Sequence, residues 1–450
     1  MNKYITHIIK RLKYPNKRYK WLRFIKQNEF KSMKHNVDIQ KDLLFNILKY
    51  SVNNVPYYQS VSKEENITLN RKNIFENIRK FPVLDKKILR NEFDNLTAEN
   101  YDGKYFKNTS GGSTGEPAIF LQDRNYFEKG QACKLLFDSW VGKKGGEKKL
   151  KLWGSERDIL KGGQGWKAKL KEEFLNVKLL NTFRMSEQDM MKFVKEINKF
   201  KPKLIEAYVQ SIYEFAKFIK NRKIEIYSPE GVITSAGTLY PEMKKLIEEV
   251  FNCKVLNRYG SREVGDVACS CNKDRGLHIN LFNNYVEILD DNLKPCTPGQ
   301  MGKIYVTTLN NYSMPLIRYD IGDVAVPSDK ICSCGRGLPL IESVKGRTNS
   351  IIKTKKGVFD SVAISALLYF YKEGVPFQSF SKYQIIQKSL NKIIFKVIIK
   401  DKQRWKDEKK IIKKKFMKTL GKDCKIRWEF VDEIKPTKSG KYQYIISEVD

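Results

Sequence analysis

The chain has 450 residues, 41% of them hydrophobic, and carries a formal net charge of +34. This length allows a large core and more than one domain, and no apolar run approaches the ~20 residues that a membrane-spanning helix needs. Eight cysteines are too few for a disulfide framework, and a total of three histidines argues against histidine-based catalysis.

The strong positive charge allows more than one interpretation. A field of this sign attracts nucleic acids, anionic lipids or anionic metabolites, whereas abundant Lys, Asn and Ile are also expected from an AT-rich coding sequence. We favour the compositional explanation for most of the charge. The sequence has neither interleaved arginine and aromatic repeats nor a known nucleic-acid-binding module, so we expect no nucleic-acid partner.

Residues 1–100 are predicted to be mostly helical. Apolar positions recur at helical spacing over residues 39–52, and Asp85 is placed to cap a helix over residues 86–90. Lysines and arginines interleave with leucines and aromatic residues over residues 10–26. This segment either lies on an anionic membrane face or forms a solvated helix whose aromatic side chains pack on the body. Since the N-terminus lacks a signal-peptide core, we expect a cytoplasmic protein, with peripheral contact to the inner membrane face left open.

A stretch rich in glycine and hydroxyl side chains lies between two short strand-like runs. It reads Thr109, Ser110, Gly111, Gly112, Ser113, Thr114, Gly115, Glu116 and Pro117. Backbone N–H groups in such a turn form a concave anion site to which hydroxyls add donors, although clusters of this composition are usually flexible surface loops. No lysine follows the last glycine, so the stretch is not a P-loop. Its meaning depends on partners elsewhere in the chain.

Strand-like runs alternate with amphipathic helices between residues 105 and 310. A helix is predicted over residues 186–200 with Ser186 as its cap, and two strands end in tight turns at Ser235 and Gly260. This alternation indicates an α/β domain with a mostly parallel sheet. Ligands of such sheets lie off the carboxyl ends of the strands, so these two turns are candidate binding positions.

The pattern changes after residue 346. Strands predicted over residues 392–400 and 425–431 flank a highly charged helix over residues 401–420, which indicates a small α+β domain. We therefore expect three parts: a mostly helical region (1–100) packed on the large domain, an α/β core (101–345) and a small C-terminal domain (346–450).

Four later motifs are candidates to complete a nucleotide site around the glycine-rich stretch. They are Tyr259, Gly260, Ser261 and Glu263 at a strand end, Gly322 with Asp323, Gly346 with Arg347, and Ser439, Gly440 and Lys441. Each motif alone is common in ordinary turns. In this order and spacing, the set resembles the adenylate-forming superfamily, and most closely its phenylacetate–CoA ligase branch with the CapK-type members of capsular polysaccharide biosynthesis.

The resemblance implies an ATP-dependent ligase that converts a carboxylic acid to acyl-AMP, releases pyrophosphate and passes the acyl group to an acceptor. It also implies a large α/β domain with a small, mobile C-terminal α+β lid. By likeness, Thr109 to Gly115 hold the phosphates, and Glu263 binds Mg²⁺. The adenine is bordered by Ser235, Ala236 and Gly237, and Tyr259 stacks on it beside Gly260 and Ser261. Asp323 takes the ribose hydroxyls, Arg347 approaches the ribose or phosphate, and Lys441 bridges the carboxylate and the α-phosphate.

Metal-ligating side chains gather in one region of the sequence. Cys269, Cys271 and His278 are followed by Cys332 and Cys334. Two close pairs from separate segments are the usual form of a zinc site, and free core cysteines are the alternative. Some members of the branch show the same pattern, and this likeness selects Cys271, His278, Cys332 and Cys334 as Zn²⁺ ligands and leaves Cys269 spare. A site closed by four protein ligands is expected to be structural.

The acid and the acceptor stay open. By family likeness, the acid pocket lies between the sheet and the helix after Glu206, where Trp153, Tyr208 and Tyr213 are candidate lining residues. The acceptor is either an amine of a surface polysaccharide precursor, which gives an amide, or CoA, which gives a thioester. The CapK likeness favours the amine.

Overall fold

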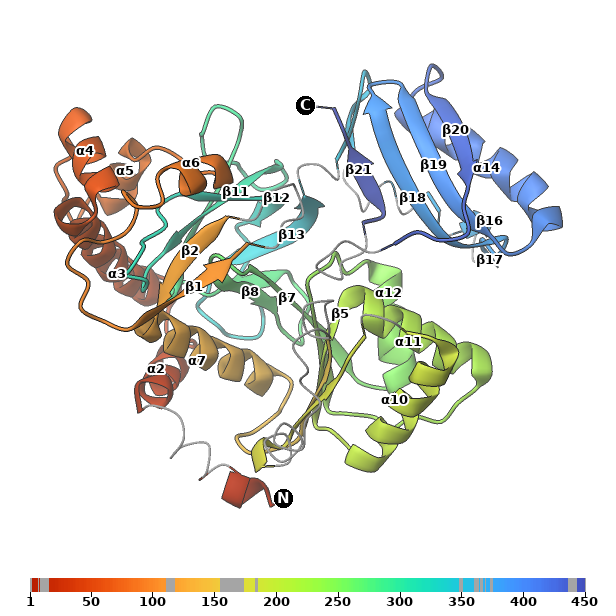
Figure 1. The fold of residues 1–450 in the computed structure, drawn as a ribbon, viewed down its shortest axis with the longest axis horizontal. Coiled ribbons are helices and arrows are strands. Elements are labelled where there is room, and N and C mark those ends of the chain that lie inside the picture. The colour runs from red at the N-terminus through yellow and green to blue at the C-terminus, as the bar shows by residue number, and fades with distance from the viewer. Residues whose placement is uncertain are drawn as a thin grey trace. The chain divides into compact units, whose positions relative to one another are not determined.

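The computed structural model describes residues 2–6, 8, 16–110, 118–153, 174–182, 185–347, 351–359, 364, 367–368, 370–372, 375–435 and 443–449. The chain forms two compact units (Figure 1). The first comprises Met1–Ile321 with Ala325–Ser343, and the second comprises Gly322–Val324 with Val344–Asp450. Among the described residues, no helix is both long enough and apolar enough to span a membrane.

The elements follow one another in chain order as in Figure 1. The helices are α2 (Asn16–Asn28), α3 (Met33–Asn54), α4 (Pro56–Glu64), α5 (Ile74–Asn77), the 3-10 helix η1 (Ile78–Lys80), α6 (Lys86–Asn91), α7 (Arg124–Trp140), α10 (Glu187–Phe200), α11 (Val209–Arg222), α12 (Pro241–Phe251) and α14 (Lys402–Leu420). The strands are β1 (Tyr105–Thr109), β2 (Ile119–Asp123), β3 (Lys149–Leu152), β4 (Val177–Leu180), β5 (Leu204–Tyr208), β6 (Gly231–Ser235), β7 (Lys254–Ser261), β8 (Gly265–Ser270), β9 (Leu277–Ile279), β10 (Asn284–Leu289), β11 (Gly302–Thr308), β12 (Tyr319–Ser328), β13 (Leu340–Arg347), β14 (Ile352–Thr354), β15 (Gly357–Phe359), β16 (Phe370–Lys372), β17 (Val375–Pro376), β18 (Phe380–Ser389), β19 (Lys392–Ile399), β20 (Lys425–Phe430) and β21 (Ile445–Ser447).

The largest sheet has eleven strands in the order β10-β11-β12-β13-β9-β8-β7-β6-β5-β3-β4. Strands β4, β3, β5, β6 and β7 pair in parallel, which is the predicted β-α-β region. The pairs β7–β8, β8–β9, β9–β13 and β10–β11 are antiparallel. A short turn joins β7 to β8, which allows this pairing. Together with the small C-terminal α+β part, this sheet confirms the expected fold class.

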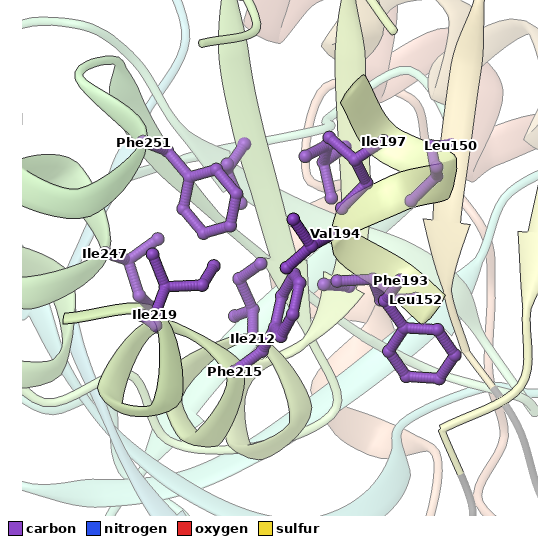
Figure 2. Close-up of a cluster of buried hydrophobic side chains, with 14 of the residues drawn as sticks. Leu150, Leu152, Phe193, Val194, Ile197, Ile212, Phe215, Ile219, Ile247 and Phe251 are labelled. Carbon is purple, nitrogen blue, oxygen red and sulfur yellow. The ribbon is translucent and has the colours of Figure 1, made fainter. Parts of the chain in front are cut away.

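Helices α10, α11 and α12 cover one face of the parallel strands (Figure 1). Alternate strand residues such as Leu150 and Ile205 point to this face, where they pack with helix residues such as Phe193 and Phe215. Figure 2 shows that this cluster consists of hydrocarbon side chains. Helix α10 begins at the predicted cap, where the hydroxyl of Ser186 accepts a hydrogen bond from the N–H of Asp189 in a capping box.

Helix α7 covers the opposite face of the same strands. Its Phe137 packs with Leu204 of β5 and Ile233 of β6. The side chain of Asp123 caps the helix by accepting from the Tyr126 N–H at 2.7 Å. Since Asp123 ends β2, this cap also fixes the angle between the β1–β2 hairpin and α7.

The N-terminal helices contain two predicted features. Residues 39–52 lie within α3, which ends before Pro56, and the side chain of Asp85 accepts from the Ile88 N–H at 2.7 Å to cap α6. Both predictions are confirmed.

Helix α2 belongs to the segment with two open interpretations. Trp21 stacks on Phe24, which packs edge-on against Phe282, and Trp21 Nε1 donates to Asn283 Oδ1 at 3.0 Å. The aromatic side chains of its described part therefore pack on the body, as the solvated-helix interpretation expects. The opposite side of the helix exposes Lys17, Lys20, Arg23 and Lys26.

The second unit contains a four-stranded sheet in the order β20-β19-β18-β21. Strands β18 and β19 pair antiparallel, whereas β20 and β21 add in parallel at the two edges. Helix α14 packs on this sheet through Trp405, Ile412 and Phe416, and the Asp401 side chain caps it by accepting from the N–H groups of Gln403 and Arg404, each at 3.0 Å. The strands and the helix predicted for this region are confirmed.

Candidate active site and candidate metal centre

Two of the expected nucleotide motifs lie at the carboxyl ends of neighbouring parallel strands. Ser235 ends β6, and Tyr259 and Gly260 lie near the end of β7, which pairs with β6. Ala236 then takes a positive φ of 62°, so the chain turns sharply after Ser235. Ligands of parallel sheets bind outside such strand ends, and the turns at Ser235 and Gly260 therefore form one edge of a candidate site.

Only glycine fits at position 260. A Cβ there would lie 2.2 Å from Gly265 O and 2.9 Å from Asp266 Cα, distances that real contacts do not reach. The tight approach lets β7 and β8 form a hairpin in which Gly260 pairs with Asp266 and Ser261 pairs with Gly265. Glu263, the expected Mg²⁺ ligand, lies in the turn of this hairpin and is 5% exposed.

The glycine-rich stretch is described only at its ends. Thr109 pairs with Ile119 in the β1–β2 hairpin. Next to this pair, the Ser110 N–H donates to Ala118 O and the Ala118 N–H donates to Ser110 Oγ, both at 2.8 Å. These bonds close the base of a loop between residues 110 and 118. The predicted phosphate-binding residues Gly111, Gly112, Ser113, Thr114 and Gly115 lie outside the described residues.

Gln122 connects this hairpin to the Tyr259–Glu263 region. Its Nε2 donates to Arg262 O at 2.9 Å, and its Oε1 accepts from Asn108 Nδ2 at 3.1 Å. The structure thus brings the base of the glycine-rich loop beside the turn that carries Glu263, although the two segments are far apart in sequence. Gln122 was not predicted from the sequence. The sequence pattern that could have indicated it is its position, as a polar residue directly after the apolar run at residues 118–121.

Asp323 and Arg347 contact each other within the second unit. Arg347 Nε lies 3.1 Å from Asp323 Oδ1, and the two side chains are 24% and 12% exposed. The pair sets a carboxylate acceptor beside a cation, and the ribose and phosphate contacts expected of these residues stay predictions. Lys441, the expected catalytic lysine, lies outside the described residues.

The expected acid-pocket aromatics separate into two places. The ring centroids of Trp153 and Tyr208 are 4.0 Å apart at the carboxyl end of β5. Tyr213 instead packs against the apolar cluster under α10–α12, where burial raises its pKa to about 12. The structure therefore brings Trp153 and Tyr208 together and places Tyr213 elsewhere.

The structure also brings the four predicted metal ligands together. The ligand atoms of Cys271, His278, Cys332 and Cys334 all lie within 4.8 Å of one another. Cys271 Sγ is 3.6 Å from Cys332 Sγ, and Cys334 Sγ is 3.3 Å from His278 Nε2. A Zn²⁺ ion binds sulfur at about 2.3 Å and nitrogen at about 2.0–2.1 Å in a tetrahedron, so these separations fit one shared ion. Cys269 lies instead in the hydrophobic core beside α7.

Apolar side chains such as Leu340 and Trp140 pack against these residues, and one ion pair lies beside them. Arg336 donates to Glu29 Oε2 at 2.8 Å, and Trp140 Nε1 donates to the same oxygen at 3.0 Å. Burial raises the pKa of Cys334, but hydrogen bonds from the backbone and side chain of Arg336 outweigh burial and lower it. Burial, with Arg336 nearby, lowers the pKa of His278 to about 4. Neutral imidazole and thiolate are the forms that bind a metal.

Comparison with known proteins completes this description. Residues 351–448 match the family model of the CapK C-terminal domain. Protein CapK of Staphylococcus aureus is 25% identical over 422 residues, which cover 92% of this chain and 89% of that protein. The crystal structure of 2-hydroxyisobutyryl-CoA ligase in the postadenylation state, in complex with R3-HIB-AMP, matches with a TM-score of 0.71 at 16% identity and covers 91% of this chain and 89% of that chain. The chain is similar to Protein CapK over most of its length and has the fold of the adenylate-forming ligases.

A second relative is a coenzyme A ligase. The phenylacetate-coenzyme A ligase of Thermus thermophilus is 23% identical over 355 residues, which cover 77% of each protein. The relatives and the fold agree with the expected enzyme class, an ATP-dependent carboxylate ligase that forms AMP. The resemblance stated from the sequence is thereby confirmed.

Proposed function

We propose that the chain activates a carboxylic acid with ATP and Mg²⁺ as acyl-AMP, releases pyrophosphate and transfers the acyl group to an acceptor. The observation that carries this proposal is the contact of Gln122 with Arg262 O, 2.9 Å long. This contact holds the base of the glycine-rich loop beside the turn at Tyr259 and Glu263. Phosphate-binding and base-binding motifs are useful to one nucleotide only if they lie together, and this contact joins them.

The chemistry explains why these residue types are needed. A carboxylate and a triphosphate are both anions, so catalysis depends on positioning and on positive charge near the α-phosphate. We assign the β- and γ-phosphates to Thr109, Ser110 and residues 111–115. The adenine is bordered by Ser235, Ala236 and Gly237 together with Tyr259, Gly260 and Ser261. Asp323 accepts hydrogen bonds from the ribose hydroxyls, and Arg347 and Lys441 supply positive charge. Glu263 would hold Mg²⁺, which neutralises charge on the triphosphate when bound.

The acceptor that we propose is an amine of a surface polysaccharide precursor, so that the product is an amide. The support is the greater likeness to Protein CapK, which extends over 92% of the chain and includes the C-terminal domain. The second candidate is CoA, which would give a thioester. It is favoured by the phenylacetate-coenzyme A ligase relative, which covers 77% of the chain.

We also propose that Cys271, His278, Cys332 and Cys334 bind one structural Zn²⁺. The supporting observations are the donor set of three sulfurs and one imidazole nitrogen, and ligand atoms within 4.8 Å of one another. Four protein ligands leave no open position for substrate or water. The ion would therefore stabilise the fold and take no part in acyl transfer.

We also propose that the chain contacts an anionic membrane surface through α2. The exposed residues Lys17, Lys20, Arg23 and Lys26 form a basic face on α2, and such faces attract anionic lipids. The aromatic residues Trp21 and Phe24 pack on the body, so this contact would be electrostatic and sensitive to salt.

The test of the proposed function is acid-dependent release of pyrophosphate from ATP and Mg²⁺, first without an acceptor and then with CoA or with amino sugars and amino acids. Release with an acid supports adenylation, and the product formed after each addition separates thioester from amide. If ATP does not bind, the assignment of residues 109–117 is wrong. If ATP binds but no acid causes release in the presence of any acceptor, the chain is not an adenylating enzyme.

A further inference from the structure

The two faces of the parallel strands differ in chemistry. The face under α10–α12 is hydrocarbon (Figure 2), whereas buried charged side chains extend across the same strands from Lys149, the first residue of β3, to Asp266 of β8. We call these side chains the buried ion cluster. Its members are Asp138 on α7, Lys149 on β3, Glu206 on β5, Arg258 on β7 and Asp266 on β8.

The members of the cluster are linked in series by ion pairs. Lys149 Nζ lies 2.8 Å from Asp138 Oδ1 and 2.8 Å from Glu206 Oε2. Arg258 Nη2 lies 2.5 Å from Glu206 Oε1, and Arg258 Nε lies 3.4 Å from Asp266 Oδ1. Burial opposes the charge of Glu206, but Arg258 and Lys149 hold its pKa well below the ordinary value. The Glu206 carboxylate is therefore already neutralised by its protein partners.

Several buried atoms of the cluster and its surroundings lack a hydrogen-bond partner. Within the part of the chain that the structure describes, Glu206 Oε2 and Arg258 Nε make ion pairs but no hydrogen bond, and Arg258 Nη1, Asp266 Oδ2 and the phenol oxygen of Tyr126 have no hydrogen-bond partner. Arg258 is 3% exposed and Tyr126 is 5% exposed, so bulk water cannot act as their hydrogen-bond partner. Buried polar groups without partners are rare in native proteins and costly, and three together call for a bound group that satisfies them.

These unsatisfied atoms lie next to the candidate site. Arg258 directly precedes Tyr259 in β7, and Asp266 pairs with Gly260 in the β7–β8 hairpin. Tyr126 of α7 reaches the same hairpin, because a Cβ on Gly265 would lie 3.1 Å from the Tyr126 phenol oxygen.

We propose that the Asp266 end of the buried ion cluster binds a hydroxyl group of the acid substrate, so that the protein activates a hydroxy carboxylic acid rather than a plain alkyl or aryl acid. The inference rests on the proposed function. Arg258 Nη1 needs an acceptor and Asp266 Oδ2 needs a donor. A hydroxyl supplies both, whereas an ammonium group has no acceptor and a carboxylate has no donor. Tyr126 can exchange a further hydrogen bond with the same hydroxyl.

The alternative occupant is a structural water molecule, which can also satisfy two to four buried polar atoms. The two occupants predict different selectivity. A site built to hydrogen-bond a substrate hydroxyl rejects the analogue that lacks it, because the buried groups are then left unpaired. If a fixed water occupied the position, the protein would use plain acids as well as hydroxy acids, or better.

The experiment compares matched acids that differ by a single group. Butanoate, 3-hydroxybutanoate and 3-aminobutanoate form one set, and phenylacetate and 4-hydroxyphenylacetate form another. Pyrophosphate release with ATP and Mg²⁺ gives kcat/KM, and ligand-observed NMR measures binding of each acid without turnover. We expect the hydroxy member of at least one set to be preferred by about 100-fold or more, both over the plain acid and over the amine.

Two variants identify the groups responsible, and a third serves as the control. Arg258→Met and Tyr126→Phe should lower the preference for the hydroxyl at least tenfold while the KM for ATP stays unchanged. Tyr126→Phe is included because it removes an unsatisfied oxygen, so it should fold even if Arg258→Met does not. The matched control is Tyr58→Phe, since the Tyr58 hydroxyl donates to Pro315 O at 2.9 Å. This control should lower stability and leave the hydroxyl preference intact.

Each outcome gives a decision. Equal or better use of plain acids, or a preference that both Tyr126→Phe and Arg258→Met leave unchanged, overturns the inference while adenylation stands. Absence of pyrophosphate release with every acid overturns the proposed function. In that case selective NMR binding of a hydroxy acid still supports the hydroxyl site, whereas unselective binding or no binding rejects it.

Discussion

At the scale of single residues, Gly260 shows how closely the candidate nucleotide site is constrained. A Cβ at this position would lie 2.2 Å from Gly265 O, so the β7–β8 hairpin would have to open. We expect Gly260→Ala to lower the free energy of unfolding by about 1–3 kcal/mol, as overpacking does, and to weaken ATP binding. Urea unfolding and a nucleotide-binding titration measure the two effects.

The control for this prediction is another glycine in the same unit. Gly130 lies in α7, and a Cβ there meets nothing within 4 Å. Gly130→Ala should stabilise the protein by about 0.4–1 kcal/mol, since alanine lowers the entropy of the unfolded chain. A Gly260→Ala variant as stable as the wild type would show that the hairpin is not as tight as described.

Lys129 gives a prediction about pH. Its Nζ lies 3.9 Å from the centre of the Trp21 ring and 2.5 Å from Asn310 Oδ1. Burial lowers its pKa from 10.5 to about 8, although Asp123 opposes the shift. Between these two values the unfolded chain holds the proton and the folded chain releases it. The free energy of unfolding should therefore rise by about 2–3 kcal/mol as the pH increases from 8 to 10.5.

The measurement is urea unfolding of the wild type and of Lys129→Met at several pH values between 7.5 and 10.5. Other lysines and tyrosines also titrate in this range, so the informative quantity is the difference between the two proteins. The variant should be the more stable protein at pH 7.5, and the difference should shrink as the pH rises. A difference that is constant with pH contradicts the lowered pKa.

At the scale of elements, the candidate metal centre joins segments that the chain separates. Cys271 follows β8, His278 lies in β9, and Cys332 and Cys334 lie between β12 and β13. A bound ion would tie these elements together, and metal-binding energy is then folding energy. We expect one equivalent of zinc per chain. Its removal by a chelator should lower the Tm before it lowers the rate of pyrophosphate release.

Metal analysis and thermal unfolding check this prediction. Cys334→Ser should lose the zinc and lower the Tm. The control is Cys296→Ser, because Cys296 is partly exposed and lies outside the four-ligand group. Full stability in the presence of a chelator, with no zinc in the purified protein, would make these residues ordinary core cysteines.

The elements also show where sequence patterns predict well. The cap at Ser186, the cap at Asp85 and the helix over residues 401–420 were all predicted and are confirmed. Each of these features depends on residues that are close in sequence, so a local sequence pattern is enough to predict it. The antiparallel pairing after β7 was not predicted in detail, because it depends on which strands meet rather than on their composition.

At the scale of the whole molecule, the proposed mechanism depends on Lys441 of the C-terminal domain. A lysine supplies a compact charge on a flexible stem. We expect Lys441→Ala to reduce acid-dependent pyrophosphate release at least 100-fold, while folding and ATP binding stay nearly intact. Pyrophosphate release, thermal unfolding and a nucleotide-binding titration test the three parts of this prediction.

Lys435 provides the matched control for Lys441. It is exposed, and its Nζ lies 3.8 Å from Glu433 Oε2 in a surface ion pair, which contributes little. Lys435→Ala should therefore leave the release of pyrophosphate unchanged. Acyl-AMP formation at the wild-type rate in Lys441→Ala would show that the catalytic role of Lys441 is assigned wrongly.

The sequence by itself determined the fold class and the resemblance to adenylate-forming ligases, because these depend on local patterns and on their order along the chain. It also selected Cys271, His278, Cys332 and Cys334, which the structure places within 4.8 Å of one another. Only the tertiary structure decided that Gln122 joins the glycine-rich hairpin to the Glu263 turn, and that Arg258, Asp266 and Tyr126 share buried, unsatisfied atoms. The physical reason is that such contacts join strands and helices distant in sequence. Sheet topology and burial bring them together, and a linear pattern contains neither.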